Sequence, residues 1–191
     1  LALQLAALQR YVAPGPQRRL LAVFAAIYMA RLNVMARWLL PRELATEELT
    51  IVALVWVPMI LASYTYGATL HQPESAQLLV AAAAYAVGSF LNSFSELQRK
   101  WWKARPEFKG RLFTLGLFSL ARNIIYFGDV VLFGGWALAT GAWWNAWAPA
   151  TMFLSFHFYH VPDKEAYLAK RYEKDWPAYR ASTKSLIPWV L

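Results

Sequence analysis

Long uncharged segments alternate with short basic ones along this chain. No Asp, Glu, Lys or Arg occurs from 49 to 73, from 75 to 95, or from 130 to 162. A helix that crosses a bilayer needs about 20 apolar residues. The first two uncharged segments each fit one such helix, whereas the third suits two shorter helices joined by a turn between Gly141 and Pro149. The pattern predicts an all-α, polytopic membrane bundle.

Prolines and charged residues set the expected ends of about five to six membrane helices. The expected helices or membrane-depth segments are Leu20–Leu40, Leu49–Tyr66, Ala76–Trp102, Leu112–Asn123, Tyr126–Thr140 and Trp147–Tyr159. Pro41 and Pro106 are expected to end helices, and Pro58 to kink one, because proline has no backbone N–H to donate. Residues 163–191 are predicted to form a basic, amphipathic tail. The length of the chain suits one integral membrane domain over residues 1–191.

Composition and charge support this interpretation. The chain is 59% hydrophobic and 16% charged, whereas a soluble domain carries about 25% charged residues. Its net charge of +8 would suggest nucleic acid in a soluble protein. Here the Lys and Arg residues cluster between apolar segments, where anionic lipid explains them. We therefore expect membrane lipids as partners and no nucleic acid. The absence of cysteine excludes disulfides and thiolate chemistry.

The two basic regions, 99–111 and 164–184, are separated by one predicted hairpin and so lie on the same side of the membrane. The positive-inside rule makes that side, with the C-terminus, cytoplasmic. Arg18 and Arg19 then fall on the opposite side, which conflicts mildly with the rule.

The first candidate constellation is Asn92, Glu96, Lys100 and Lys103. Steps of four, four and three place these side chains on one helical face. Asn and Glu suit ribose hydroxyls or an amide, and the two lysines with Arg111 suit phosphates. A solvated helix end, with salt bridges and lipid-phosphate contacts, explains the same spacing.

The second constellation is Arg122, Asn123, Tyr126 and Asp129. Asp129 stands at the head of a long apolar segment, where an acid is stabilised by the helix dipole. It is therefore either an N-cap or a ligand for a hydroxyl or amide of a cofactor.

Tyr28 and Arg31 are three residues apart and share a helical face. A phenol beside a cation could protonate a substrate oxygen. Packing, or anchoring at the membrane interface, is the alternative role of such a tyrosine.

The histidines do not predict a metal site. His157 and His160 are three apart beside a proline, and no second cluster accompanies Asp163 and Glu165. We expect no metal, and a phosphate contact or an interfacial position for His160.

These motifs, in this order, resemble the integral membrane steroid 5-alpha-reductases. Their superfamily also contains the sterol C14 reductases, the isoprenylcysteine carboxyl methyltransferases and a bacterial branch of steroid-reductase-like proteins. The residues that carry the resemblance are Asn92 and Glu96, Lys109-Gly110, Gly116-Leu117-Phe118, Ala121 to Asp129, Tyr167-Leu168, Arg171-Tyr172, Tyr179, Thr183 and Ile187-Pro188. The resemblance covers 92–189, which it makes the cofactor-binding half. A weaker match places Tyr28 and Arg31 on a Tyr-x-x-Arg motif of the reductases.

The resemblance implies an NADPH-dependent reductase of a lipophilic enone, such as a steroid or polyprenoid, in a bacterial inner membrane. NADPH would lie with its phosphates against the cytoplasmic basic residues. Tyr28, beside Arg31, would polarise the carbonyl. The implied cofactor contacts are Asn92, Glu96, Lys100, Lys103, Arg111, Asn123, Tyr126, Asp129, His160 and Tyr167.

The chain departs from the family pattern at several of these positions. Asn123-Ile124-Ile125 replaces the usual His-Pro-Asn, and Asp129 replaces a glutamate. Lys100 and Lys103 stand where the family has arginines, which bind phosphate in a fixed fork geometry. Two alternatives therefore stand beside the reductase: a membrane methyltransferase that uses S-adenosylmethionine, and a non-catalytic lipid-binding membrane protein.

Overall fold

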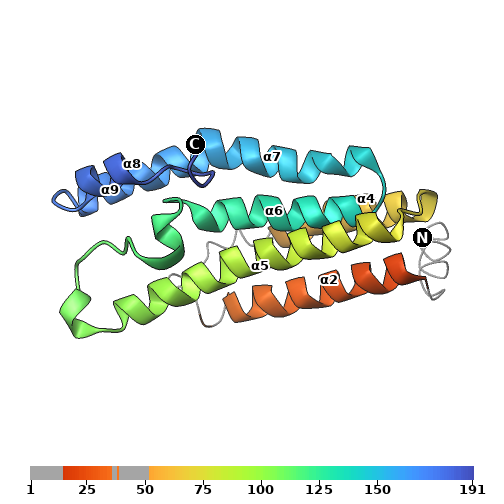
Figure 1. The fold of residues 1–191 in the computed structure, drawn as a ribbon, viewed down its shortest axis with the longest axis horizontal. Helices are drawn as coiled ribbons and strands as arrows, with labels where there is room; N and C mark the ends of the chain where they lie inside the picture. Colours follow the sequence, from red (N-terminus) through yellow and green to blue (C-terminus); the bar gives the residue numbers. More distant parts are fainter. Residues whose placement is uncertain (1–14, 36–37, 39–51) are drawn as a thin grey trace. The chain divides into compact units, whose positions relative to one another are not determined.

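The computed structural model describes residues 15–35, 38 and 52–191, and all regular structure in these residues is helical (Figure 1). The α-helices are α2 (Pro16–Val34), α4 (Val57–Leu70), α5 (Ser75–Lys103), α6 (Ile124–Ala139), α7 (Trp147–Ser155), α8 (Val161–Arg171) and α9 (Trp176–Ser182). The π turns are η2 (Val52–Trp56) and η6 (Phe156–His160), and the 3-10 turns are η3 (Pro106–Phe108), η4 (Gly116–Ser119) and η5 (Trp143–Ala146). The predicted all-α class is confirmed for the described residues.

The chain divides into two compact units. Unit 1 comprises Leu1–Tyr85 and Phe133–Ala148, and unit 2 comprises Ala86–Leu132 and Pro149–Leu191. The division therefore falls within α5, α6 and α7. Each unit has buried side chains of its own, which are described separately below.

The membrane-like character rests on three apolar helical segments. Among the described residues, α5 is long and apolar enough to cross a bilayer, and shorter apolar helices cover Leu54–Leu70 and Ile124–Ala139. Only 33% of the apolar window of α5 is buried, and Leu79 is 72% exposed. Exposed apolar surface of this kind marks contact with lipid or a partner. These helices indicate a membrane protein, but the predicted five to six membrane helices are not confirmed in the described part.

The predicted boundaries hold at some positions and fail at others. The hairpin in the third uncharged segment is confirmed, with Gly141 (φ 75°) in the turn between α6 and α7. Pro58 lies in the first turn of α4, directly after the π turn η2, and the expected kink stays a prediction. The expected end at Pro41 and start at Leu49 lie outside the described residues.

The segment Leu112–Asn123 does not return as a helix. It forms extended chain and the short turn η4, which begins at Gly116 in the left-handed region (φ 62°). Glycine adopts this conformation without steric cost. A Cβ at Gly116 would also lie 2.5 Å from Nε2 of Gln98, so the loop packs closely against α5.

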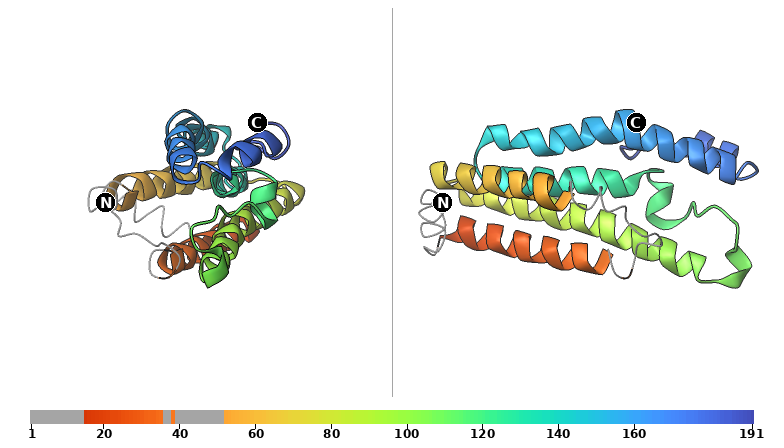
Figure 2. Two further views of the ribbon diagram at one scale, coloured as in Figure 1. Left: turned by 90° about the vertical axis from the view of Figure 1, so that its left-hand side faces the viewer. Right: turned by 180° about the vertical axis from the view of Figure 1, so that it is seen from behind.

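Trp136 of α6 is the centre of the core of unit 1. Phe24 of α2 stacks on Tyr85 of α5 with ring centroids 3.8 Å apart, and both present their rings edge-on to Trp136. The buried hydroxyls are satisfied, since Tyr85 donates to the carbonyl of Phe24 and Tyr64 to that of Phe133. Figures 1 and 2 show α2 running alongside the first part of α5, as these contacts require.

Gly135 allows α6 to approach α5 closely. A Cβ at this position would lie 2.5 Å from the backbone nitrogen of Tyr85 and 2.7 Å from the carbonyl of Ala81. A Cβ at the preceding residue, Gly134, would have no neighbouring atom within 4 Å. The two positions are therefore a matched pair on one helix.

We predict that Gly135→Ala lowers the stability by about 1–3 kcal/mol, because backbone atoms cannot yield as side chains do. Gly134→Ala should leave stability unchanged or raise it slightly, since alanine favours helix. Thermal unfolding of the purified chain, followed by circular dichroism, measures both. Equal effects of the two substitutions would contradict the close contact at Gly135.

Candidate cofactor site

The polar face of α5 meets α6 inside unit 2. Asn92 is 2% exposed, and its Nδ2 donates to Oδ1 of Asp129 at 2.8 Å and to the carbonyl of Ile125 at 3.3 Å. The helix α6 begins at Ile124, so Asp129 lies in its second turn. The N-cap interpretation of Asp129 is therefore wrong, and its carboxylate belongs to a buried pair with Asn92.

Glu96 follows one turn further along α5 and is 7% exposed. Its carboxylate forms an ion pair with Arg99. Lys103 lies within electrostatic range of Glu96, of Arg99 and of Arg171 from α8, and Lys100 is partly buried on the same helix. The last turns of α5 thus carry several cations and one buried acid.

A stripe of side chains from η6 and α8 covers the ring of Tyr126. The helix runs on from α7 through the π turn into α8, and its residues Phe156, His160 and Lys164 are four apart. The Phe156 ring stacks on Tyr126 at 4.5 Å, the His160 ring lies 6.2 Å away, and Nζ of Lys164 lies 4.8 Å from the Tyr126 centroid. π turns within helices are frequent at functional sites.

The Lys164 ammonium has an unusual environment for a lysine. Desolvation and, to a smaller extent, the charge of Arg99 lower its pKa, Glu96 and Glu165 raise it, and the resulting pKa is about 8. The ammonium is therefore still mostly protonated at neutral pH but titrates close to it. Glu96 on α5 attracts this cation electrostatically, and the Tyr126 ring on α6 lies beneath it.

An ion pair between Arg122 and Glu165 ties this site to the C-terminal segment. Nε and Nη2 of Arg122 donate to the two carboxylate oxygens at 3.0 and 3.1 Å. Another nitrogen of the same guanidinium donates to the carbonyl of Thr183. Asn123 and Ser185 also donate to Oε1 of Glu165, at 2.9 and 2.7 Å. The start of α6, α8 and the C-terminal segment are thus joined at one carboxylate.

Asn123, which we predicted to contact a cofactor, is completely buried in this cluster. Its backbone nitrogen donates to the carbonyl of Ser185 at 2.8 Å. Its side-chain oxygen is buried and has no hydrogen-bond partner among residues 15–35, 38 and 52–191. The observed contacts hold the C-terminal segment, and the role toward a cofactor stays a prediction.

Two further predicted contacts lie in other surroundings of unit 2. Arg111 is exposed and lines an open groove with Lys174 and Ser182. Tyr167 is 56% exposed, and its hydroxyl accepts a hydrogen bond from Arg171 at 2.6 Å.

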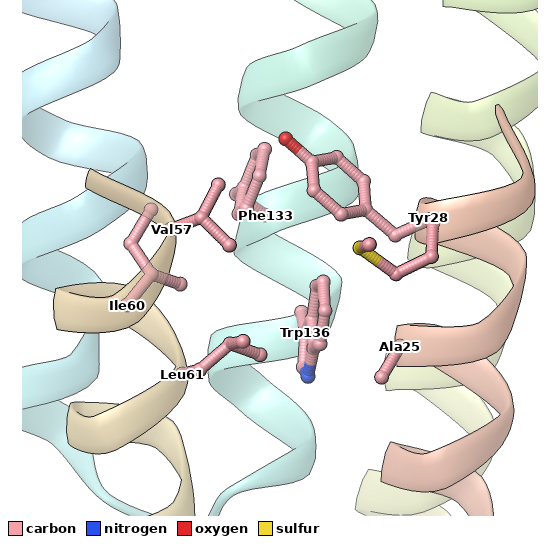
Figure 3. A pocket seen from close by; sticks show the side chains of 8 residues that line it. Ala25, Tyr28, Val57, Ile60, Leu61, Phe133 and Trp136 are labelled. Carbon is pink, nitrogen blue, oxygen red and sulfur yellow. The ribbon is translucent and has the colours of Figure 1, made fainter. Parts of the chain in front are cut away.

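Tyr28 and Arg31 belong to unit 1. The Tyr28 ring lies edge-on to Phe133 and Trp136, with centroids 5.3 and 5.7 Å away. It borders an apolar cavity of about 40 Å³ between side chains of α2, α4 and α6 (Figure 3). The residues that line the cavity are Ala25, Tyr28, Met29, Val57, Ile60, Leu61, Phe133 and Trp136.

Ligand pockets usually measure about 300–1,000 Å³, so this cavity does not accommodate a steroid as it stands. The ring contacts of Tyr28 with Phe133 and Trp136 agree with the alternative role of this residue, which is packing. Catalysis by Tyr28 and Arg31 stays a prediction.

The histidines have aromatic neighbours. His157 stacks on Phe153 at 5.9 Å, and His160 faces Tyr126 and Phe156. Within the part of the chain that the structure describes, no three His, Cys, Asp or Glu side chains gather closely enough to hold a metal ion.

The site residues predicted from the sequence do not include Lys164 or Glu165. The spacing of Phe156, His160 and Lys164 was a usable signal, because residues four apart share a helical face. The partnership of Arg122 with Glu165 had no local signal, since 43 residues separate the two along the chain.

The described residues are all-helical and membrane-like, with a partly buried polar cluster on α5, α6 and α8. Residues 33–185 match the family described as "Protein of unknown function (DUF1295)", and the chain belongs to this family. A 106-residue segment is 34% identical to the probable O-methyltransferase ustE of Ustilaginoidea virens. This segment covers 55% of the chain and 36% of that relative, so the chain spans well under half of the relative's length. The relative's name agrees with the methyltransferase branch of the superfamily that the sequence resembles, rather than with the reductase branch.

We predict that Glu165→Ala destabilises the protein by about 3–5 kcal/mol, because it leaves the buried Arg122 cation without its partner. The C-terminal segment should then be cleaved faster by trypsin, which cuts after Arg180 and Lys184. The matched control is Glu173→Ala, at an exposed acid in the turn that follows α8. Limited proteolysis with mass spectrometry measures the effect, and equal cleavage of the two variants would contradict the proposed anchoring.

We predict that Lys164→Met raises the thermal unfolding temperature at pH 7. Below its folded-state pKa of about 8, the buried charge of Lys164 lowers the free energy of unfolding. This penalty disappears as pH rises toward the pKa of an unfolded lysine, about 10.4. The advantage of the variant should therefore shrink between pH 8 and pH 10.5. Tryptophan fluorescence melts at several pH values measure it, with Lys170→Met, at an exposed position of α8, as the control. A pH-independent difference for Lys164→Met would contradict the assignment.

Proposed function

We propose that this protein transfers a methyl group from S-adenosylmethionine to an oxygen of a lipophilic acceptor. The observation that carries the proposal is the mixed-charge site around Tyr126, where the Lys164 cation lies over an aromatic ring and within electrostatic range of the buried Glu96 and the partly buried Glu165. The name of the relative from Ustilaginoidea virens supports the same chemistry. The apolar exposed helices suit an acceptor that arrives from the lipid phase.

The residues of the site fit this cofactor. S-adenosylmethionine carries a carboxylate, an ammonium and a sulfonium, so a site for it needs both signs of charge. Lys164 would hold the carboxylate, and the Tyr126 ring would favour the sulfonium through its negative face. Glu96 and Asp129 would accept hydrogen bonds from the ammonium or the ribose hydroxyls. When bound, the cofactor supplies an electrophilic methyl group.

A second candidate is the NADPH-dependent reduction of a lipophilic enone. It is favoured by the excess of cations around Glu96, since Arg99, Lys103 and Lys164 all lie within its electrostatic range. Clustered cations suit phosphates better than a single carboxylate. Tyr28 would then be the electrophile for the carbonyl.

Titration of the purified full-length chain in detergent with S-adenosylmethionine, S-adenosylhomocysteine and NADPH separates the two candidates. We predict that S-adenosylmethionine binds and that Asp129→Asn weakens its binding by about 10- to 150-fold, because a charge-assisted hydrogen bond contributes about 1.5–3 kcal/mol. Tyr126→Leu should weaken the binding of S-adenosylmethionine by about 2- to 30-fold more than the binding of S-adenosylhomocysteine, because the thioether of the latter is uncharged.

The control for the aromatic substitution is Tyr159→Leu, at an exposed position of the same π turn that carries His160. This variant should bind like the unaltered protein. Binding of NADPH without binding of S-adenosylmethionine would overturn the methyltransferase and leave the reductase as the better account.

A further inference from the structure

Unit 2 contains a polar groove whose lining shares no residue with the cluster around Tyr126. Two segments line it, one from Arg111 to Ser119 and one from Lys174 to Thr183. Each segment contributes one exposed cation, Arg111 and Lys174 respectively. Hydroxyl groups complete the lining, from Thr114, Ser119, Ser182 and Thr183. Those of Ser119 and Ser182 donate to the carbonyls of Gly116 and Tyr179. Cations and hydroxyls are the donors that phosphate oxygens accept from.

The acid in this lining already has a partner. Oδ2 of Asp175 accepts a hydrogen bond from the backbone nitrogen of Leu112 at 3.3 Å. This bond joins the two segments across the groove and draws the carboxylate toward the backbone. The groove therefore presents more positive than negative charge to a ligand.

The groove is built before any ligand arrives, because Asp175 anchors its loop at Leu112 and two further hydrogen bonds anchor the loop at Leu117 and Phe118. The backbone nitrogen of Leu117 donates to Oε1 of Gln98 on α5 at 3.0 Å. The Tyr179 hydroxyl donates to the carbonyl of Phe118 at 2.7 Å, and burial raises the pKa of this phenol well above its ordinary value, so it remains a donor. A preformed groove avoids the cost of ordering its walls on binding.

The anchor on α5 places this loop where that helix leaves its apolar part. Trp101, three residues after Gln98, is exposed. The ring centroid of the next residue, Trp102, lies 5.3 Å from that of Phe113 in the loop. Tryptophan gathers at the level of lipid headgroups. Leu115, between the lining residues of the loop, is exposed as well. The groove thus combines phosphate donors with apolar side chains near the end of a membrane-length helix.

We propose that this groove binds the phosphate headgroup of an anionic membrane lipid, with Arg111 and Lys174 as its two cationic contacts. The lipid would sit outside the proposed cofactor site and would fix the C-terminal segment at the membrane surface. Each cation near an anionic surface contributes enough to change affinity about fivefold. Arg111 is then a lipid contact rather than the cofactor contact that the sequence resemblance implied.

The test measures lipid retention by the purified full-length chain in nanodiscs that contain phosphatidylcholine with a minor fraction of phosphatidylglycerol. We expect preferential retention of phosphatidylglycerol, a loss of about fivefold for Arg111→Gln or Lys174→Gln, and little change for Lys174→Arg. The matched control is Lys109→Gln, at an exposed cation two residues before Arg111 that does not line the groove.

Two further measurements on the unaltered protein make the outcome decisive. Salt at about 1 M should reduce the preference for phosphatidylglycerol, because the Debye length falls to about 3 Å. Adenosine 2′-phosphate, a soluble phosphate, should not displace the lipid. Unchanged retention in the Arg111→Gln/Lys174→Gln double variant, or displacement by adenosine 2′-phosphate, would overturn the proposal.

Discussion

The ion pair between Arg122 and Glu165 is the contact on which the candidate site depends. It joins the start of α6 to α8, and the same guanidinium binds the backbone of the C-terminal segment. Together with the stacking of Phe156 on Tyr126, it fixes α6 relative to α8, and so brings Tyr126 and Lys164 into the contact that creates the cation site. A buried pair of this kind contributes little net stability but is costly to break. Its main effect is to define one arrangement of three segments.

The same contacts separate two surfaces of unit 2, the polar cluster and the groove. The face of α6 that carries Tyr126 and Asp129 turns toward α5 and α8, where the polar cluster is buried. The C-terminal segment, which Arg122 and Glu165 hold, contributes instead to the groove with Arg111. One set of hydrogen bonds thus shapes two surfaces of different chemistry.

The sequence predicted the helical class, the turn at Gly141 and the polar face of Asn92 and Glu96, because these follow from local periodicity and composition. It failed for Leu112–Asn123, where an apolar segment folds as a loop around Gly116. The N-cap alternative for Asp129 also failed, because Asp129 lies within α6 and its partner Asn92 comes from another helix. Glu165 acquires its importance only through Arg122, 43 residues away along the chain, and no local pattern encodes that partnership.

Photolabelling tests the central claim most directly. The purified chain would be irradiated with S-adenosylmethionine that carries a radioactive methyl group, and the labelled peptides would be identified by mass spectrometry. Our account predicts label within 122–129 or 156–165, suppressed by excess S-adenosylhomocysteine. Label confined to other peptides, or suppressed by NADPH but not by S-adenosylhomocysteine, would contradict it.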